Sequence, residues 1–481
     1  MLTCLSDYHS YINHLISFYD EYKTLFDYRL NNVSFNKALC KMIALDVDSV
    51  IPFMHSFYSN IGRPASHQIE ILRSLVLMAH FRCFSPKKWV KKLRNDKLLA
   101  LLSGFNPDDI PSFSSFYDFF NRFYCSSTLH RTDYILESKH FSCDKKNKPK
   151  NHSKLVNFTP DDTHSLYQLY LKNIDHTEQL EERPLLYLFN MLGVEFSFTH
   201  HLLDNHIIIS GDGSASKTHS NPYGTKIDDN HNRYSDIDAD FVWDSDLERF
   251  YFGYTSFNIS CIHHQYNIDL PLFLTLAKAS RHDALTSMSA LAQFKSINSS
   301  LSISHYCLDS ASDNYSTHKL AYSFGIIPII DINKRNTGNN VYEPYKDISE
   351  NGRPICMGGY ETVRDGFDRK RYRHKFRCPF AQRIGENPCP CKDKCSNSPY
   401  GRVFHIKSDK DIKLFGPVPY KSEQWKLIYK DRTCTERINT RILNDYKFTD
   451  CRMHGRKRNF FMLVMIGINI HLDAYNKVSS M

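Results

Sequence analysis

Three acidic residues, far apart in the sequence, have the side chains and surroundings that could bind divalent metal ions. Asp212 and Asp309 each follow an apolar, β-prone segment, and Glu436 lies in a basic segment with helical character. Carboxylate oxygens suit Mg²⁺, which binds few protein ligands and leaves room for substrate phosphates. A pair of such ions can activate water or a DNA 3′-hydroxyl to attack a phosphodiester. The acids therefore predict metal-dependent chemistry on nucleic acid.

Taken alone, each acid is a weak indication of a metal site. An Asp after a strand more often caps a turn or a helix. Asp313 is an alternative to Asp309, but we favour Asp309 because it directly follows the apolar segment. Lys217 and His219 follow the first acid, and they either contact the scissile phosphate or cap a turn. The prediction depends on the three acids meeting at one place.

The central part of the chain alternates segments typical of strands and of helices. An amphipathic helix is expected over 282–294 and a second helix over 314–324. Three consecutive strands, followed by alternating helices and strands, match a ribonuclease H-like sheet. The expected strands are residues 207–209, ending at Asp212, then 241–243 as a hairpin partner of 250–261, then 270–276, 302–308 and 326–332. The fold prediction is a mixed α/β core in which strand ends bring Asp212 and Asp309 together.

The third acid lies in a helix expected over 425–446. Tyr429, Arg432 and Glu436 are at positions i, i+3 and i+7, so they share one face of that helix. Glu436 can then face the metal ions while Tyr429 and Arg432 reach the DNA backbone. Further phosphate contacts are expected from Arg437 and Arg441. The alternative interpretation is a salt-bridged surface helix.

These residues resemble the signature of bacterial insertion-sequence transposases of the DDE class, named for an Asp-Asp-Glu triad. The resemblance covers nearly the whole chain. It implies that Asp212, Asp309 and Glu436 are catalytic and hold Mg²⁺ or Mn²⁺, that the core is ribonuclease H-like, and that two copies act together on DNA. The similar segments are 62–64 and 103–113 in the N-terminal region, 211–214 and 308–314 around the two Asp residues, and Tyr429-x2-Arg432-x3-Glu436.

Two positions depart from the family pattern. Many relatives have a Lys seven residues after the Glu, where this chain has Leu443, so Lys447 or Arg441 takes that role or the role is absent. The second motif has Ser312 where an aromatic residue is common. Neither change removes a metal ligand, so we expect an active site.

The N-terminal region is expected to be helical. A helix is expected over 67–80, and another begins at Ser85-Pro86 and carries basic residues on one face. From Arg82 to Lys97 there are seven Lys or Arg residues and one acid, which suits phosphate contacts. The expected DNA contacts are Lys88, Lys91 and Lys92. The alternative is a helical scaffold with a solvated basic face.

A second basic segment separates Asp309 from Glu436. From 364 to 377 there are seven Lys or Arg residues and two acids, and Arg371 and Arg373 are expected to contact DNA. Some transposase subgroups carry an insertion at this place. Four thiolates could close a structural Zn²⁺ site, with His374 and His405 as substitutes; the alternative is unbound thiols. The candidate ligands are Cys378, Cys389, Cys391 and Cys395.

The bulk properties agree with a nucleic acid partner but do not require one. The chain has 481 residues and a formal net charge of +9. Its 14 cysteines, without a secretory leader, favour a reducing compartment, and the apolar segment 460–468 is too short to span a membrane. We expect a cytoplasmic, nucleoid-associated protein. The expected domains are 1–135 (helical, DNA-binding), 136–200 (linker and helical connection), 201–335 (catalytic core), 336–424 (basic Cys-rich insertion) and 425–481 (core helices with the Glu).

The functional hypothesis is a DNA transposase that cuts the ends of its element and joins them to target DNA. Two alternatives stay open. A related metal-dependent nuclease would cleave without joining. A catalytically inactive, transposase-derived protein would bind DNA and be insensitive to loss of Asp309.

Overall fold

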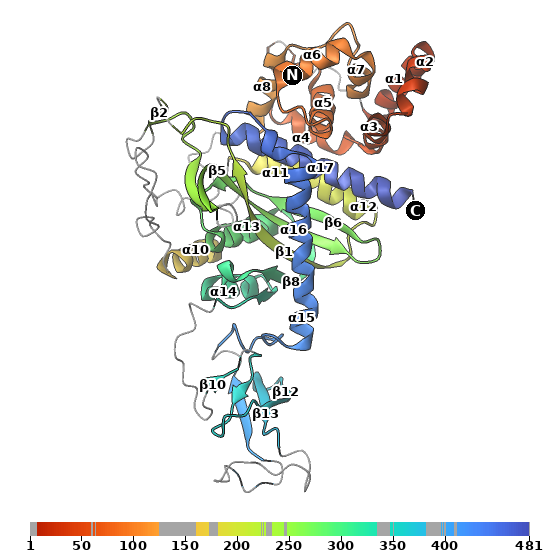
Figure 1. Ribbon diagram of the computed structural model, residues 1–481. Helices are drawn as coiled ribbons and strands as arrows, with labels where there is room; N and C mark the ends of the chain where they lie inside the picture. Colours follow the sequence, from red (N-terminus) through yellow and green to blue (C-terminus); the bar gives the residue numbers. More distant parts are fainter. Residues whose placement is uncertain are drawn as a thin grey trace. The chain divides into compact units, whose positions relative to one another are not determined.

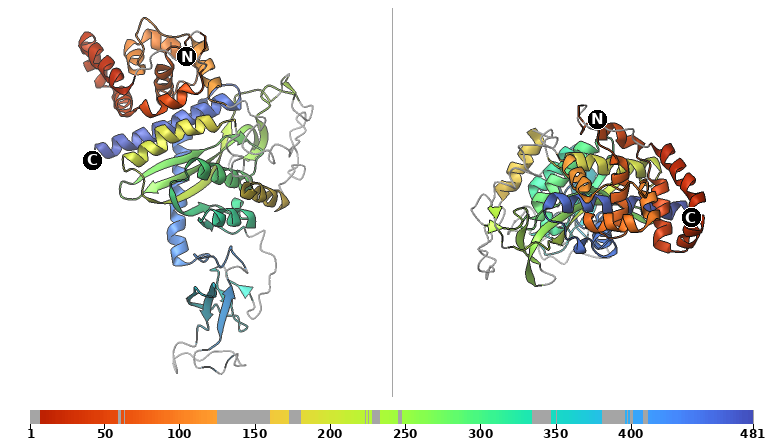
Figure 2. Two further views of the ribbon diagram at one scale, coloured as in Figure 1. Left: turned by 180° about the vertical axis from the view of Figure 1, so that it is seen from behind. Right: turned by 90° about the horizontal axis from the view of Figure 1, so that it is seen from above.

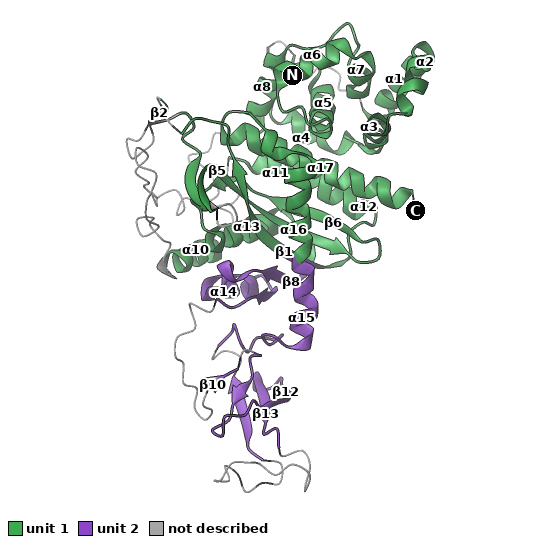
Figure 3. Cartoon of the chain, viewed as in Figure 1, with its two compact units in different colours: residues 1–207, 211–302, 433–481 green, residues 208–210, 303–432 purple. Residues whose placement is uncertain are grey.

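The chain folds into two compact units (Figure 3). The first unit comprises residues 1–207, 211–302 and 433–481, and the second comprises 208–210 and 303–432. The computed structural model describes residues 7–58, 61–62, 64–124, 160–172, 181–222, 224, 226–227, 233–244, 248–333, 347–349, 351–380, 396, 398, 401–407 and 411–480. The domain limits expected from the sequence stay a prediction.

The N-terminal part of the first unit is helical, as expected (Figure 1). Helix α6 begins at Pro86 because Ser85 caps it, accepting a hydrogen bond from the Lys88 N–H, and Trp89 is buried beneath it. The helices are α1 (Tyr8–Glu21), α2 (Lys23–Leu30), α3 (Val33–Ala44), α4 (Ile51–His55), α5 (Gln68–His80), α6 (Pro86–Asn95), α7 (Lys97–Ser103) and α8 (Phe113–Arg122). The helices predicted over 67–80 and from Ser85 are confirmed.

The sheet of the first unit is built around one long strand, β5 (Arg249–His263). It pairs antiparallel with β4 (Asp240–Asp244), β6 (Ile268–Leu274) and the short β7 (Ala277–Lys278). On its other side, β5 lies next to β1 (His206–Lys217). The expected hairpin and the three consecutive strands are thus confirmed. A small separate pair is formed by β2 (Lys226–Ile227) and β3 (Arg233–Tyr234).

Helices cover this sheet on both faces (Figure 2). Seen from behind, α17 (Arg456–Ser479) runs beside α11 (Arg183–Phe189) and α12 (Phe196–Thr199) above the strands, and α13 (Asp283–Ile297) lies below them with α10 (Pro160–Lys172). The prediction of an amphipathic α13 was wrong. Every residue from 284 to 294 is buried, because the helix packs between β5 and β6 on one side and α10 on another.

The second unit combines a parallel strand pair with a small antiparallel sheet. β8 (Ser302–Leu308), α14 (Tyr315–Ser323) and β9 (Ile327–Ile330) form a β-α-β unit, with residues 208–210 of β1 beside β8. Helix α15 (Glu423–Tyr429) packs on these strands through a core that includes Trp425 and Ile428. The expected strand-helix-strand order is confirmed, and the chain is a mixed α/β protein.

The segment between β9 and α15 contains β-strands that were not predicted from its composition. β12 (Val363–Asp368), β13 (Arg373–Arg377) and β14 (Val403–Lys407) form an antiparallel sheet, and β10 (Asp347–Ile348) pairs with β11 (Pro354–Ile355). In β13, His374 and Phe376 are buried while the basic residues between them are half-exposed. This alternation of buried and basic side chains produces a strand in a segment expected to be loop-rich.

Helix α17 contains the apolar segment 460–468, and the sequence predicts a helix there over 458–475. Its residues 459–472 are all buried. Among the described residues, no helix has the length and apolar character needed to cross a membrane.

A buried lysine joins the N-terminal helices to α17. Lys41 of α3 has its Nζ 2.8 Å from Asp473 Oδ1 and 3.0 Å from both the Tyr446 hydroxyl and Asn469 Oδ1. Tyr446 also donates a hydrogen bond to Asp473. Burial lowers the pKa of Lys41 to about 8, although Asp473 opposes the change. A buried ammonium group persists here because acceptors surround it.

Replacing Lys41 by Ala is expected to lower the free energy of unfolding by about 3 kcal/mol. That is the lower end of the range for a broken buried pair, because Arg441 still neutralises Asp473. Urea unfolding would measure the difference. The control is Lys37→Ala, which removes an exposed lysine from the same helix and should leave stability nearly unchanged. Equal effects of the two substitutions would contradict the role given to Lys41.

Candidate active site

Asp212 lies within strand β1, not at its end. The prediction that the strand ends at Asp212 was wrong, since β1 continues to Lys217. Gly and Asp disfavour strands, but pairing with the long β5 overrides that preference. The approach is close: a Cβ on Gly253 of β5 would lie 2.4 Å from the Ser216 carbonyl oxygen. The Ser256 hydroxyl also donates to the Ser214 carbonyl at 3.3 Å. Asp212 is therefore held on a rigid strand.

A chain of amide hydrogen bonds connects Asp212 to helix α16 (Thr433–Thr440). Asn258 Nδ2 of β5 donates to Asn439 Oδ1 at 2.8 Å, and Asn439 Nδ2 donates to Asp212 Oδ2 at 3.2 Å. Both asparagine side chains are buried. Asn439 lies three residues after Glu436, so the two share one face of α16. The helix that carries the third acid therefore packs against the strand that carries the first.

The basic residues of this helical segment are engaged within the chain. Arg437 donates two hydrogen bonds of 2.7 Å to the Asp269 carboxylate of β6 and one to Thr433. Arg441 forms an ion pair with Asp473 at 3.2 Å. These contacts fix α16 and the following turn, and contacts of the two arginines with DNA stay a prediction. The expected single helix over 425–446 is divided into α15, a 3-10 turn at Lys430–Arg432, α16 and a π-turn at Arg441–Asp445.

A further acid approaches Gly213, the residue that follows Asp212. A Cβ placed on Gly213 would lie 2.4 Å from Asp283 Oδ1, at the N-terminus of α13. Only a residue without a side chain fits between the strand and this carboxylate. Sequence reasoning missed Asp283, because nothing in the sequence relates the first turn of α13 to β1.

Asp309 lies directly after β8, as expected. Its side chain accepts a hydrogen bond from the Ala311 N–H and caps a short 3-10 turn. The alternative, Asp313, is used elsewhere: it is buried, 2.8 Å from Lys413 Nζ, and accepts a hydrogen bond from the Asn333 N–H. This geometry supports the preference for Asp309.

A second acid missed by sequence reasoning accompanies Asp309. Leu308 and Ile330 are partners in the parallel β8–β9 pair, so Asp309 and Asp331 follow neighbouring strands at the same level. Asp331 accepts a hydrogen bond of 2.6 Å from the Tyr420 hydroxyl. The strand-end rule that identified Asp309 would also have identified Asp331, because it too follows an apolar run.

Arg432, which the sequence predicts to reach the DNA backbone, affects the electrostatics of Asp309. Burial raises the pKa of Asp309 above its ordinary value, while Arg432 and two backbone N–H groups oppose the rise. The Arg432 guanidinium lies 5.7 Å from the centre of the Tyr429 ring. Burial raises the pKa of Tyr429 to about 12, so its hydroxyl keeps its proton at neutral pH. Tyr429 and Arg432 thus lie close to Asp309 in the second unit.

The three acids are divided between the units. Asp212 and Glu436 belong to the first unit and Asp309 to the second, so their meeting at one site stays a prediction. In the described part of the chain, no group of three or more His, Cys, Asp or Glu side chains is arranged to hold a metal ion. By its chemistry, a set of carboxylates of this kind fits Mg²⁺ or Mn²⁺.

The other residues predicted to contact phosphate or DNA differ in their exposure and in the groups they contact. Lys217 Nζ lies 5.9 Å from the Tyr251 ring centre, and the His219 ring contacts the Thr449 carbonyl oxygen at 3.0 Å. In the N-terminal region, Lys88 and Lys91 are exposed, whereas Lys92 lies 4.5 Å from the Phe81 ring centre. Arg371 is exposed and Arg373 pairs with Asp368.

The zinc hypothesis stays open. Cys378 is buried, and Cys389, Cys391 and Cys395 lie outside the described residues. Of the two possible substitutes, His374 already donates a hydrogen bond of 2.6 Å to the Phe415 carbonyl oxygen, whereas His405 faces solvent.

Replacing Gly213 by Ala should disturb strand β1 next to Asp212 while leaving the Asp212 side chain itself unchanged. The new methyl group would collide with Asp283, so we expect a lower melting temperature, partly recovered in the Gly213→Ala/Asp283→Ala double variant. Ser214→Ala serves as the control, because only the Ser214 backbone oxygen receives the hydrogen bond from Ser256. A double variant less stable than Gly213→Ala would argue against the collision.

Replacing Arg432 by Gln should raise the pKa of Asp309 further, because a cation that favours the carboxylate is lost. The measurement is a pH titration of aspartate carboxyl carbons by NMR in metal-free protein, with Asp309→Asn assigning the signal. Lys430→Gln removes the same charge two residues earlier and should have a smaller effect. An unchanged or lower pKa in Arg432→Gln would refute the pairing.

Comparison with known proteins gives one family match. The model of the family described as Transposase domain (DUF772) matches residues 28–122, the segment from the end of α2 through α8. No curated protein and no solved structure matches the chain. The family match supports a transposase role for this protein.

Proposed function

We propose that the protein is a DDE-class DNA transposase with a ribonuclease H-like core. The observation that carries the proposal is the hydrogen bond between Asn439 and Asp212, which connects the helix of Glu436 to the strand of the first acid. The family match to residues 28–122 supports it independently, from a different part of the chain. The parallel β8–β9 pair, with residues 208–210 of β1 beside β8, agrees with a core of this kind.

In the proposed site, Asp212, Asp309 and Glu436 hold two Mg²⁺ or Mn²⁺ ions. When bound, such ions supply activation of the attacking oxygen and stabilisation of the leaving oxygen in phosphoryl transfer. The chain's own residues orient the reaction. Asn439 holds the Asp212 carboxylate through its Oδ2, and the rigid strand fixes the direction of that side chain.

Arg432 and Tyr429 have a second role in this proposal. Arg432 favours the ionised form of Asp309, which is the form that binds a metal, and with Tyr429 it reaches a phosphate of the bound strand. The substrates are the ends of the protein's own element and then the target DNA. Two copies hold the two ends, so the protein acts as a homodimer on DNA, associated with the nucleoid.

The test is a strand-transfer assay with labelled element-end duplex, supercoiled plasmid and Mg²⁺ or Mn²⁺. Asp212→Ala, Asp309→Ala and Glu436→Ala should each reduce joined product by about 10²-fold or more, because charge stabilisation in the transition state is lost. Glu423→Ala is the matched control, since this acid on α15 is exposed and pairs only with Lys426 at 3.5 Å among the contacts described for it.

The assay also separates the alternatives. Cleavage that never yields joined product would support a nuclease. Intact binding of the ends, with neither cleavage nor joining by the wild-type protein, would support a DNA-binding protein derived from a transposase.

A further inference from the structure

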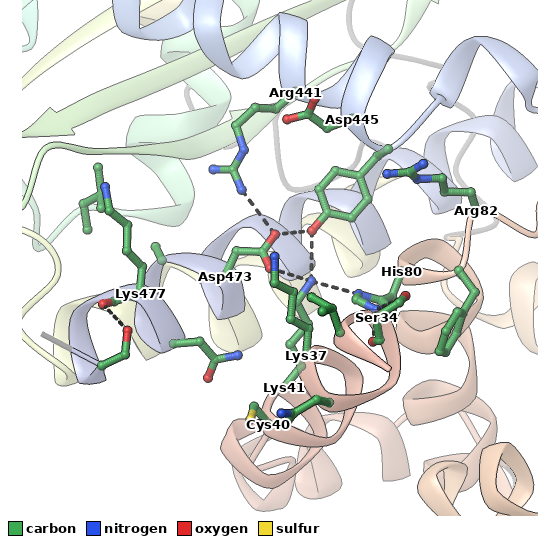
Figure 4. Close-up of a pocket in the computed structure, with 18 of the residues that line it drawn as sticks. Ser34, Lys37, Cys40, Lys41, His80, Arg82, Arg441, Asp445, Asp473 and Lys477 are labelled. Carbon is green, nitrogen blue, oxygen red and sulfur yellow. Dashed lines mark hydrogen bonds and ion pairs between the residues drawn. The ribbon is translucent and has the colours of Figure 1, made fainter. Parts of the chain in front are cut away.

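A large groove in the first unit is lined by residues that the proposed chemistry does not use (Figure 4). Its volume is 1190 Å³, and its walls come from α3, the residues after α5, the start of β6, the π-turn after α16 and the end of α17. Five of the lining side chains are Lys or Arg and three are Asp. The family match covers only the part of the groove wall that is formed by α3 and the residues around the end of α5.

The acidic side chains of the groove are largely neutralised within the chain. Asp473 contacts Lys41 at 2.8 Å and Arg441 at 3.2 Å, and it also accepts a hydrogen bond from Tyr446. Asp269 is paired with Arg437 through two hydrogen bonds of 2.7 Å. Asp445 is the third acid of the groove, and it lies beside Arg441 in Figure 4.

The remaining cations are directed to solvent. Lys37, Arg82 and Lys477 are exposed. Within the described residues, the side chains of Lys37 and Arg82 make no hydrogen bond or ion pair, and the Lys477 ammonium group contacts only the backbone carbonyl oxygens of the β5–β6 turn. Figure 4 shows Arg82 and Lys477 on opposite sides of the Lys41–Asp473 pair. The groove thus has three cations available for an anionic ligand, against one acid.

The backbone at Arg82 accommodates glycine. Its φ is 55°, in the left-handed region that Gly adopts more easily. Seven other described residues that are not Gly also have a positive φ, so this conformation does not by itself mark a site, but it allows Gly to replace Arg82 without backbone strain.

We infer that this groove binds the sugar-phosphate backbone of DNA, with Lys37, Arg82 and Lys477 contacting phosphates. The inference rests on the proposed function, because it names a path for the same DNA. The volume of 1190 Å³ far exceeds that of one small anion, and the three available cations lie on α3, just after α5 and on α17, so they can contact separate phosphates of one strand. Its floor is the Lys41–Asp473–Arg441 network, and Arg441 directly follows α16. DNA in the groove therefore lies against the turn that fixes the helix of Glu436.

The first arm of the test measures how DNA affinity depends on salt. The triple variant Lys37→Gln/Arg82→Gly/Lys477→Gln should lose affinity for duplex DNA, and the slope of log K against log salt should shrink by about 2–3, since each phosphate contact contributes about 0.9. Gly at position 82 relieves the backbone strain, so loss of folding is not expected. The control removes the same charge from exposed lysines elsewhere, as Lys23→Gln/Lys172→Gln/Lys319→Gln, and should change the slope less.

The second arm reports on the groove itself. Cys40 is exposed and lines the groove. Bound DNA should slow its reaction with maleimide, followed by peptide mass spectrometry, and the triple variant should lose this protection at DNA concentrations that saturate the wild type.

Unchanged Cys40 reactivity in the DNA complex, or an unchanged slope in the triple variant, overturns the inference while leaving the proposed function intact. If inorganic phosphate at the same phosphate concentration protects Cys40 as well as DNA does, the ligand is a small anion and the inference is overturned. Failure of the wild-type protein to bind DNA at all would instead refute the proposed function.

Discussion

The hydrogen bond from Asn439 to Asp212 is the contact on which the candidate site depends. It links two elements more than two hundred residues apart in the sequence, strand β1 and helix α16. The buried amide of Asn439 lies between the Asp212 carboxylate and the buried amide of Asn258. Its Nδ2 donates to Asp212 and its Oδ1 accepts from Asn258, so both amides donate in the direction of Asp212. The Asp212 carboxylate is thereby held in one orientation, which is the preorganisation that the proposed metal-assisted phosphoryl transfer requires.

Helix α16 and the turn that follows it are in turn fixed by ion pairs. Arg437, in the last turn of α16, is held by Asp269 of β6. After the helix, Arg441 and Tyr446 contact Asp473 of α17, which also pairs with Lys41 of α3. The N-terminal helices, including the segment that matches the transposase domain family, thus contact the same carboxylate as the turn after α16. The connection between those helices and the turn after α16 consists of buried and half-buried charged contacts.

Sequence reasoning identified what short-range patterns determine. The apolar run before Asp309, the Ser85 cap of α6 and the spacing of α5 each specify an element locally, and these elements are present. It failed where distant segments decide the outcome. The length of β1 depends on pairing with β5, the burial of α13 depends on what covers it, and Asp283 reaches Gly213 only through the fold. Asn439 lies three residues after the third motif, and its contact with Asp212 has no counterpart in any local pattern.

The central claim is that Asp212, Asp309 and Glu436 share one metal site. The most direct test is a crystal structure of the protein on element-end DNA with Mn²⁺, located by its anomalous scattering. The account predicts metal peaks about 2.1 Å from carboxylate oxygens of all three residues. Metal bound at other carboxylates, with any of the three acids turned away from it, would contradict the account.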